Sequence, residues 1–295
     1  MNRYYKSKAI SMLCIICILI FLVKIIKKIN STNEKFHFEN SNNTLGKKIV
    51  LITGSTSGIG KTLIGSFDAS EYKVIVHGRD KNKLNLISKQ FKYVDIICYD
   101  LSVTKNIYNL VNEIKSKYKK IDVLINNFYD GNNKEDINYQ LNTNLANNIL
   151  LSKKISEITS SEGMIINVSS GASDIINSGE SSFTDIYSLI KSGIEKFTKI
   201  LADELYIKKI AVTCLKIDDT YETNLTNDLK FLDNTYKKDP KEIIKCIKIL
   251  QKLKWNNVSG RIIYSSSLLT NEFEGLLGNN SLLFSGSNQP NSFHD

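Results

Sequence analysis

Tyr187 and Lys191, four residues apart in the stretch YSLIK, have side chains that could carry out proton chemistry. In a helix, residues at this spacing share one face. A tyrosine hydroxyl can give or take a proton, and an ammonium group one turn away stabilises the phenolate and makes it a better base. The same spacing occurs at Tyr4 and Lys8, so the pair alone does not distinguish a catalytic group from an ordinary helical turn.

A glycine-rich stretch, TGSTSGIG at residues 53–60, could bind a phosphate group. Gly54, Gly58 and Gly60 leave the backbone without side chains where a strand turns sharply into a helix. Exposed amides at such a turn suit the pyrophosphate of a dinucleotide. A short apolar run precedes the stretch and a helix-length segment follows it, and this is the context that the motif requires.

The second apolar run ends in HGRD, where the charge distinguishes between two dinucleotides. An acid at this position would accept a hydrogen bond from the free ribose 2′-hydroxyl of NAD. Gly78 and Arg79 stand there instead, and an arginine can pair with the 2′-phosphate of NADP. The sequence therefore predicts that NADP(H) is preferred and that NAD(H) is also usable. The alternative is that Arg79 is a solvated loop charge.

Seven short apolar runs alternate with helix-length amphipathic segments. Apolar strands between such helices imply a parallel sheet covered on both faces. The sequence thus predicts a doubly wound, seven-stranded α/β sheet of the Rossmann type over residues 45–267. The expected strands are Lys48–Gly54, Lys73–Arg79, Val94–Asp100, Asp122–Asn127, Gly163–Ser170, Ile210–Ile217 and Gly260–Ser265.

The N-terminus carries a nearly uninterrupted apolar run, Ala9–Val23, with lysines on both sides. Counted to Ile26, the run reaches 18 residues, enough to span a bilayer if Lys24 snorkels to the interface. No small-residue cleavage site follows, so we expect an uncleaved membrane anchor rather than a signal peptide. The expected organisation is an anchor at 1–28, a polar linker at 29–44, the domain, and a polar tail at 268–295.

The net charge of +9 is concentrated at the N-terminus. The first 28 residues contain six basic residues and no acid, which leaves +3 for the other 267. A nucleic-acid or membrane-surface binder therefore rests on lysine count alone. The three histidines are scattered, so we expect neither a metal site nor a Ser-His-Asp triad. Three widely spaced cysteines outside the anchor favour a reducing compartment and a domain facing the cytosol.

Several motifs in a fixed order resemble the short-chain dehydrogenase/reductase family over residues 45–267. They are TGSTSGIG, YDLS, DVLINN, the run containing Asn144, GMIINVSS and YSLIK. The resemblance implies binding of a nicotinamide dinucleotide, and relatives often form homo-oligomers. The cofactor contacts that it implies are Gly54, Ser55, Ser57, Gly58, Ile59, Gly60, Arg79, Asp100, Leu101, Asn126, Tyr187 and Lys191.

The same resemblance implies four catalytic roles. Tyr187 would be the acid and base, and Lys191 would tune it and bind the cofactor ribose. Ser170 would hold the substrate oxygen, and Asn144 would hold a water in a proton relay. In isolation, Ser170 could equally be a strand-end hydroxyl and Asn144 one more asparagine in an Asn-rich chain.

Departures from the family pattern keep two hypotheses open. NNFY puts Phe128 and Tyr129 where the family has small residues, and Ile217 and Asp218 stand where it usually has Pro-Gly. The first hypothesis is a membrane-anchored NADP(H)-dependent oxidoreductase that interconverts an alcohol and a carbonyl on a lipophilic small molecule. The second is a catalytically weak relative that binds a nucleotide and acts as a sensor or scaffold.

Overall fold

The computed structural model describes residue 24 and residues 46–174, 182–221 and 237–270. The expected linker and, apart from Lys24, the expected anchor lie outside these residues, as does the tail beyond residue 270. Among the helices that the structure describes, none is long and apolar enough to cross a membrane. The chain divides into two units, Met1–Gly46 and Lys47–Asp295, and the fold below belongs to the second.

A seven-stranded parallel sheet in the order β3-β2-β1-β4-β5-β6-β7 forms the centre of this unit. The direction of strand addition reverses between β1 and β4, which makes the sheet doubly wound and confirms the predicted fold class. The strands are β1 Lys48–Ile52, β2 Tyr72–Gly78, β3 Val94–Cys98, β4 Ile121–Asn126, β5 Thr159–Ser170, β6 Ala211–Ile217 and β7 Ile262–Tyr264.

Burial on both faces explains why the strands are continuous apolar runs rather than alternating ones. All seven residues of β2 are buried. The central strands are in register through small β-branched residues, with Val50 of β1 beside Val74 of β2 and Val123 of β4.

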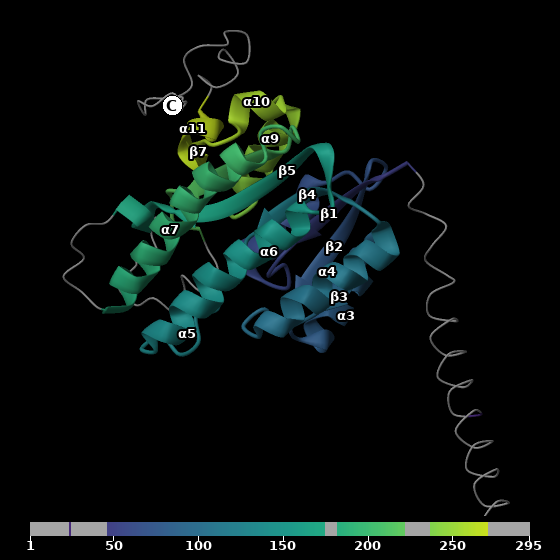
Figure 1. Cartoon of the computed structure of the whole chain (residues 1–295), viewed down its shortest axis with the longest axis horizontal. Helices are drawn as coiled ribbons and strands as arrows, with labels where there is room; N and C mark the ends of the chain where they lie inside the picture. The colour runs from purple at the N-terminus through teal and green to yellow at the C-terminus, as the bar shows by residue number, and fades with distance from the viewer. Residues whose placement is uncertain (1–23, 25–45, 175–181, 222–236, 271–295) are drawn as a thin grey trace, which may run out of the picture. The chain divides into compact units, whose positions relative to one another are not determined.

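Two hydrophobic layers cover the sheet, one on each face. Helices α4 (Thr104–Tyr118), α6 (Asn147–Ser156) and α7 (Ser182–Glu204) lie side by side over one face (Figure 1). Helices α2 (Gly58–Leu63), α3 (Lys81–Gln90) and α9 (Glu242–Lys252) contribute to the other layer. In α4 the buried residues fall at helical spacing, namely Ile107, Leu110, Val111 and Ile114.

Short elements complete the domain. A π-helical turn, η3 (Asn142–Ala146), links α5 (Ile137–Leu141) to α6. Such widened turns inside helices often occur at functional sites, and this one contains Asn144. The remaining short elements are η2 (Ile64–Ser66), η4 (Gly171–Asp174), α10 (Trp255–Val258) and α11 (Ser265–Leu269).

Candidate active site

A cleft of about 460 Å³ opens at the carboxyl edge of the sheet, where the strand order reverses. Two segments form much of its wall: residues 53–60, called here the glycine turn, and residues 127–131 after β4, called the β4 segment. The ends of β2, β5 and β6 and residues of α7 supply most of the rest. Ligands of open α/β sheets bind at this edge because loops from both halves of the sheet meet there.

The glycine turn has a backbone path that side chains would obstruct. Gly54 has φ +64° and Gly58 has φ +52°, in the left-handed region that favours glycine. A Cβ on Gly60 would lie 2.3 Å from the carbonyl oxygen of Gly54. The Asn127 side chain also donates to this carbonyl, at 3.3 Å. The turn is therefore a bare backbone cradle braced by the β4 segment.

His77 of β2 is hydrogen-bonded to the same turn. Its Nδ1 accepts a hydrogen bond from the Gly54 backbone N–H at 3.2 Å, and its Nε2 lies 2.9 Å from the Tyr99 carbonyl oxygen. These two contacts require the neutral ring with the proton on Nε2. Complete burial lowers the pKa of His77 to about 4.

The β4 segment, unlike the glycine turn, projects large side chains toward the cleft. The Phe128 ring stands edge-on to His77, with ring centroids 6.5 Å apart. The Tyr129 ring stands edge-on to Tyr187 at 5.0 Å, and its hydroxyl donates to Gln140 at 3.2 Å. The expected bulk at these two positions is therefore placed inside the cleft.

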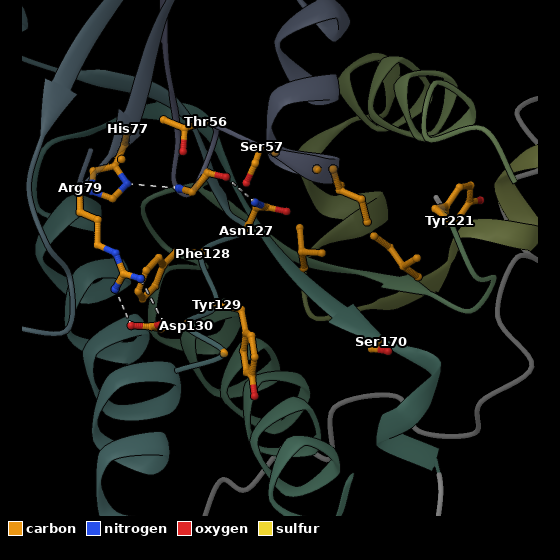
Figure 2. Close-up of a pocket in the computed structure, with 18 of the residues that line it drawn as sticks. Thr56, Ser57, His77, Arg79, Asn127, Phe128, Tyr129, Asp130, Ser170 and Tyr221 are labelled. Carbon is orange, nitrogen blue, oxygen red and sulfur yellow. Dashed lines mark hydrogen bonds and ion pairs between the residues drawn. The ribbon is translucent and has the colours of Figure 1, made fainter. Parts of the chain in front are cut away.

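An ion pair joins the ends of β2 and the β4 segment. Arg79 Nη1 donates to Asp130 Oδ2 at 2.6 Å (Figure 2). Burial alone would raise the pKa of the Asp130 carboxyl, but hydrogen bonds from Arg79 and Tyr139 outweigh burial and hold the pKa below its ordinary value. The predicted phosphate-binding arginine is thus already engaged by a carboxylate.

Three of the four predicted catalytic residues line the cleft. Ser170 ends β5, and Tyr187 and Lys191 lie one turn apart on α7. Lys191 is buried and its Nζ donates to the Val168 carbonyl oxygen at 3.0 Å. The same Nζ lies 5.5 Å from the centroid of the Tyr187 ring and 5.6 Å from that of Tyr129. The Lys191 ammonium therefore lies over both tyrosine rings.

A charged cluster fixes the turn that follows Ser170. Lys216 of β6 is buried and pairs with Asp174 at 2.5 Å and with Glu195 of α7 at 3.3 Å. Glu195 also accepts hydrogen bonds from the hydroxyls of Ser169 and Ser173. The cluster ties β5, η4, β6 and α7 together next to Ser170.

Nine of the predicted site residues line the cleft, and five do not. Those in the lining are Gly54, Ser57, Gly58, Ile59, Gly60, Arg79, Ser170, Tyr187 and Lys191. Those outside it are Ser55, Asp100, Leu101, Asn126 and Asn144.

The outlying residues have other contacts. The fully buried Ser55 hydroxyl donates to the Ile52 carbonyl at 2.6 Å, and Leu101 belongs to a hydrophobic core. Asn126 donates to Ser152 and Asn167 inside the domain, and Asp100 accepts from the Ser102 amide.

Asn144 is fully buried behind the β4 segment rather than in the cleft wall. Its Oδ1 accepts from the Asp130 amide at 2.7 Å, and its Nδ2 donates to the Asp130 carbonyl at 3.0 Å and to Gln140 at 2.8 Å. These bonds fix the Asn144 side chain against the backbone of Asp130.

Sequence reasoning missed several lining residues, including Thr56, His77 and Asp130. Thr56 lies between Ser55 and Ser57, which were both predicted cofactor contacts, so it could have been predicted with them. His77 follows the apolar run Val74–Val76 in a strand that is buried throughout, so a histidine there could have been noticed as unusual. For Asp130 the sequence contains no signal, because its partner Arg79 is 51 positions away.

A doubly wound sheet with a glycine turn at its switch point is the architecture of dinucleotide-binding folds, and comparison with known proteins identifies the family. The sequence profile of the short chain dehydrogenases matches residues 48–231. The chain therefore belongs to the short-chain dehydrogenase/reductase family, and it is an oxidoreductase.

Curated relatives are 25–33% identical to this chain over the regions that align. The 3-oxoacyl-(acyl-carrier-protein) reductase FabG of Buchnera aphidicola subsp. Baizongia pistaciae is 28% identical over 238 residues, covering 74% of this chain and 95% of that protein. The 3-ketodihydrosphingosine reductase of Bacteroides thetaiotaomicron is 28% identical over 72% of this chain and 80% of that protein. The (21S)-21-acetoxyl-apo-melianone synthase of Melia azedarach is 29% identical, over 57% of this chain and 65% of its own length.

Solved structures share the fold. An actinorhodin polyketide ketoreductase solved with NADPH has a TM-score of 0.63 at 21% identity, covering 74% of this chain and 95% of that one. A 3-oxoacyl-(acyl-carrier protein) reductase from Brucella melitensis, solved with NAD, has the same TM-score at 17% identity over the same shares.

Proposed function

We propose that this chain is an NADP(H)-dependent oxidoreductase that interconverts an alcohol and a carbonyl on a lipophilic small molecule. The observation that supports this most directly is the cleft itself. The glycine turn, Ser170, Tyr187 and Lys191 all line it. One elongated ligand could therefore contact a phosphate cradle and a proton donor at once.

The residues present fit a nicotinamide dinucleotide. A Cβ on Gly60 would collide with the Gly54 carbonyl oxygen, so this position requires glycine. A turn without side chains lets a pyrophosphate approach the backbone amides. In this proposal Lys191 holds a ribose hydroxyl, and Arg79 holds a 2′-phosphate in competition with Asp130. When bound, the dinucleotide supplies or accepts the hydride.

The chain's own residues then have to move one proton. In the reducing direction the Tyr187 hydroxyl donates its proton to the carbonyl oxygen, and the Ser170 hydroxyl donates a hydrogen bond to the same oxygen. The Lys191 ammonium stabilises the phenolate that remains. Asn144 contributes by holding the backbone of Asp130, and so the β4 segment, in place.

The lipophilic substrate is supported by the apolar run Ala9–Val23 and by the names of relatives. Two of these are reductases of 3-oxoacyl and 3-ketodihydrosphingosine compounds, which carry acyl or long-chain groups. We propose that the run anchors the chain with its domain facing the cytosol, so that substrate dissolved in the bilayer lies near the cleft. Full-length protein that is uncleaved yet partitions into the soluble fraction would exclude the anchor.

A second candidate is a nucleotide-binding sensor of the same fold. The aromatic side chains of the β4 segment favour it, because Tyr129 packs directly against Tyr187 and narrows the part of the cleft beside the Tyr187 ring. Both functions predict dinucleotide binding, so binding alone does not separate them.

Two measurements test the proposal. Thermal unfolding is followed with NADPH and with NADH, since a ligand that binds the native state raises the midpoint. Turnover is then measured on a panel of aliphatic ketones and long-chain alcohols. A shift with NADPH together with turnover supports the enzyme, binding without turnover supports the sensor, and no shift with either dinucleotide excludes both.

A further inference from the structure

Asp130 is a buried carboxylate that is held in place by residues other than Arg79. Its backbone is held on both sides by Asn144, at 2.7 and 3.0 Å. Its carboxylate accepts from the Asn132 amide at 3.0 Å and from the Tyr139 hydroxyl at 2.7 Å. The position of this negative charge is therefore set by the fold and does not depend on Arg79.

Arg79 is the adaptable partner. Its side chain is 44% exposed, whereas that of Asp130 is 3% exposed. Nη1 lies 2.6 Å and Nη2 3.5 Å from the two carboxylate oxygens, so both ends of the guanidinium face Asp130. In Figure 2 the arginine extends from the end of β2 toward Asp130 and past Phe128. The carboxylate holds the guanidinium, rather than the reverse.

This pairing changes what the cleft offers a ribose. A lone arginine would present a full positive charge to a 2′-phosphate, but the Arg79–Asp130 pair carries no net charge. A phosphate would have to compete with the carboxylate for the same nitrogens and approach a negative charge at the same time. A ribose with a free 2′-hydroxyl meets neither penalty.

We propose that Asp130 is a residue that determines cofactor specificity: by holding Arg79 it weakens the binding of dinucleotides that carry a 2′-phosphate and lets NAD(H) compete with NADP(H). The proposal rests on the dinucleotide site proposed above. The acid that influences the ribose would thus come from the β4 segment, 51 positions from the arginine, and not from the end of β2.

A double-mutant cycle tests this directly. Dissociation constants for NADPH and NADH are measured by titration calorimetry for the wild-type full-length protein, Asp130→Asn, Arg79→Ala and the double variant. Asp130→Asn should tighten NADPH about 10-fold and leave NADH within about 2-fold, because a hydrogen-bonded charge contact is worth about 1.5 kcal/mol or more. In the Arg79→Ala background the same substitution should change NADPH binding by less than about 2-fold.

A matched control separates this effect from a change in overall charge. Glu204→Gln also removes one negative charge from an ion pair, with Lys153 at 3.0 Å, but Glu204 does not line the cleft. This variant should leave the ratio of the NADPH and NADH dissociation constants unchanged. An equal gain in NADPH binding from Glu204→Gln would overturn the assignment to Asp130.

A milder variant covers the case in which Asp130→Asn does not fold. Tyr139→Phe removes the donor that shares Oδ2 with Arg79, so the carboxylate should hold the arginine more tightly. NADPH should then bind more weakly while NADH binds as before, and an unchanged ratio overturns the proposal.

The remaining outcomes of the cycle are equally distinct. If both dinucleotides bind but Asp130→Asn shifts them equally, the specificity role fails and the proposed function stands. If wild type binds neither, the dinucleotide site and this inference fail together.

Discussion

The glycine turn and the β4 segment lie against each other and line the same cleft, yet they are built in opposite ways. The glycine turn presents backbone, and its carbonyl and amide groups are held by Asn127 and His77. The β4 segment presents two aromatic rings and a carboxylate. The first has little freedom to vary, because a single Cβ would collide with backbone. The second is where side chains can alter cofactor and substrate choice without altering the fold.

The sharpest test of this contrast compares two tyrosines, Tyr187 and Tyr129, whose rings pack edge to face. Tyr187→Phe keeps the ring but removes the hydroxyl, and turnover should fall about 100-fold or more, the usual scale for general acid–base catalysis. Tyr129→Phe makes the same chemical change in the β4 segment and should lower turnover only a few-fold. Cofactor binding should hardly change in either variant. Measurement is by initial rates on the best substrate of the panel.

Lys191→Met extends this test, because the ammonium is expected to serve both the tyrosine and the ribose. Turnover should fall and cofactor affinity should weaken together. If Tyr187→Phe leaves activity per folded molecule intact, the YSLIK stretch is a structural turn and the sensor function is favoured.

A pH experiment tests the support beneath the glycine turn. The pKa of His77 is about 4 in the folded protein against 6.5 for an unperturbed histidine, so only the unfolded state takes up this proton between those values. Stability should therefore fall as the pH drops from about 6.5 to 4, by up to about 3 kcal/mol, and this contribution should be constant above and below the window. Urea unfolding across this range measures it.

The control for this experiment is His77→Asn, whose side-chain oxygen can still accept from the Gly54 amide. This variant should be less steeply destabilised by acid within the same window. Identical pH profiles for the two proteins would show that His77 is not the group responsible.

Adding one carbon to the glycine turn should lower the stability of the folded protein. Gly60→Ala places a Cβ 2.3 Å from the Gly54 carbonyl oxygen, where backbone must shift, and should destabilise the protein by about 1–3 kcal/mol. Gly65→Ala is the matched control, because its Cβ would meet only the flexible end of Ile244 at 3.3 Å. Its effect should lie within about 1 kcal/mol of zero. Equal urea midpoints for the two variants would contradict this account of the turn.

The smallest expected effect comes from making the β4 segment resemble the family pattern. Replacing Phe128 by Ala and Tyr129 by Gly removes the rings beside His77 and Tyr187, and turnover should rise several-fold if these rings crowd the nicotinamide end. A further Tyr187→Phe change should abolish the gain. An altered substrate preference with unchanged cofactor affinity would instead show that the two rings shape the substrate pocket.

The sequence by itself determined the parts of this protein that depend on local pattern. Apolar runs such as the one in β2 predict a buried strand wherever they occur, and the alternation with amphipathic helices predicts the doubly wound sheet. The glycine turn could be predicted for the same reason, since strand, glycines and helix are contiguous. The spacing of Tyr187 and Lys191 likewise follows from the geometry of one helix.

Only the tertiary structure decided which side chains meet. Arg79 was predicted to bind a 2′-phosphate, but the fold places Asp130, from the segment after β4, beside it. Ser55 and Asn144 were expected in the cleft, but their hydrogen bonds are satisfied behind its wall. Contacts of this kind depend on how strands far apart in the chain are ordered in the sheet, and the short-range pattern of residues contains no record of that order.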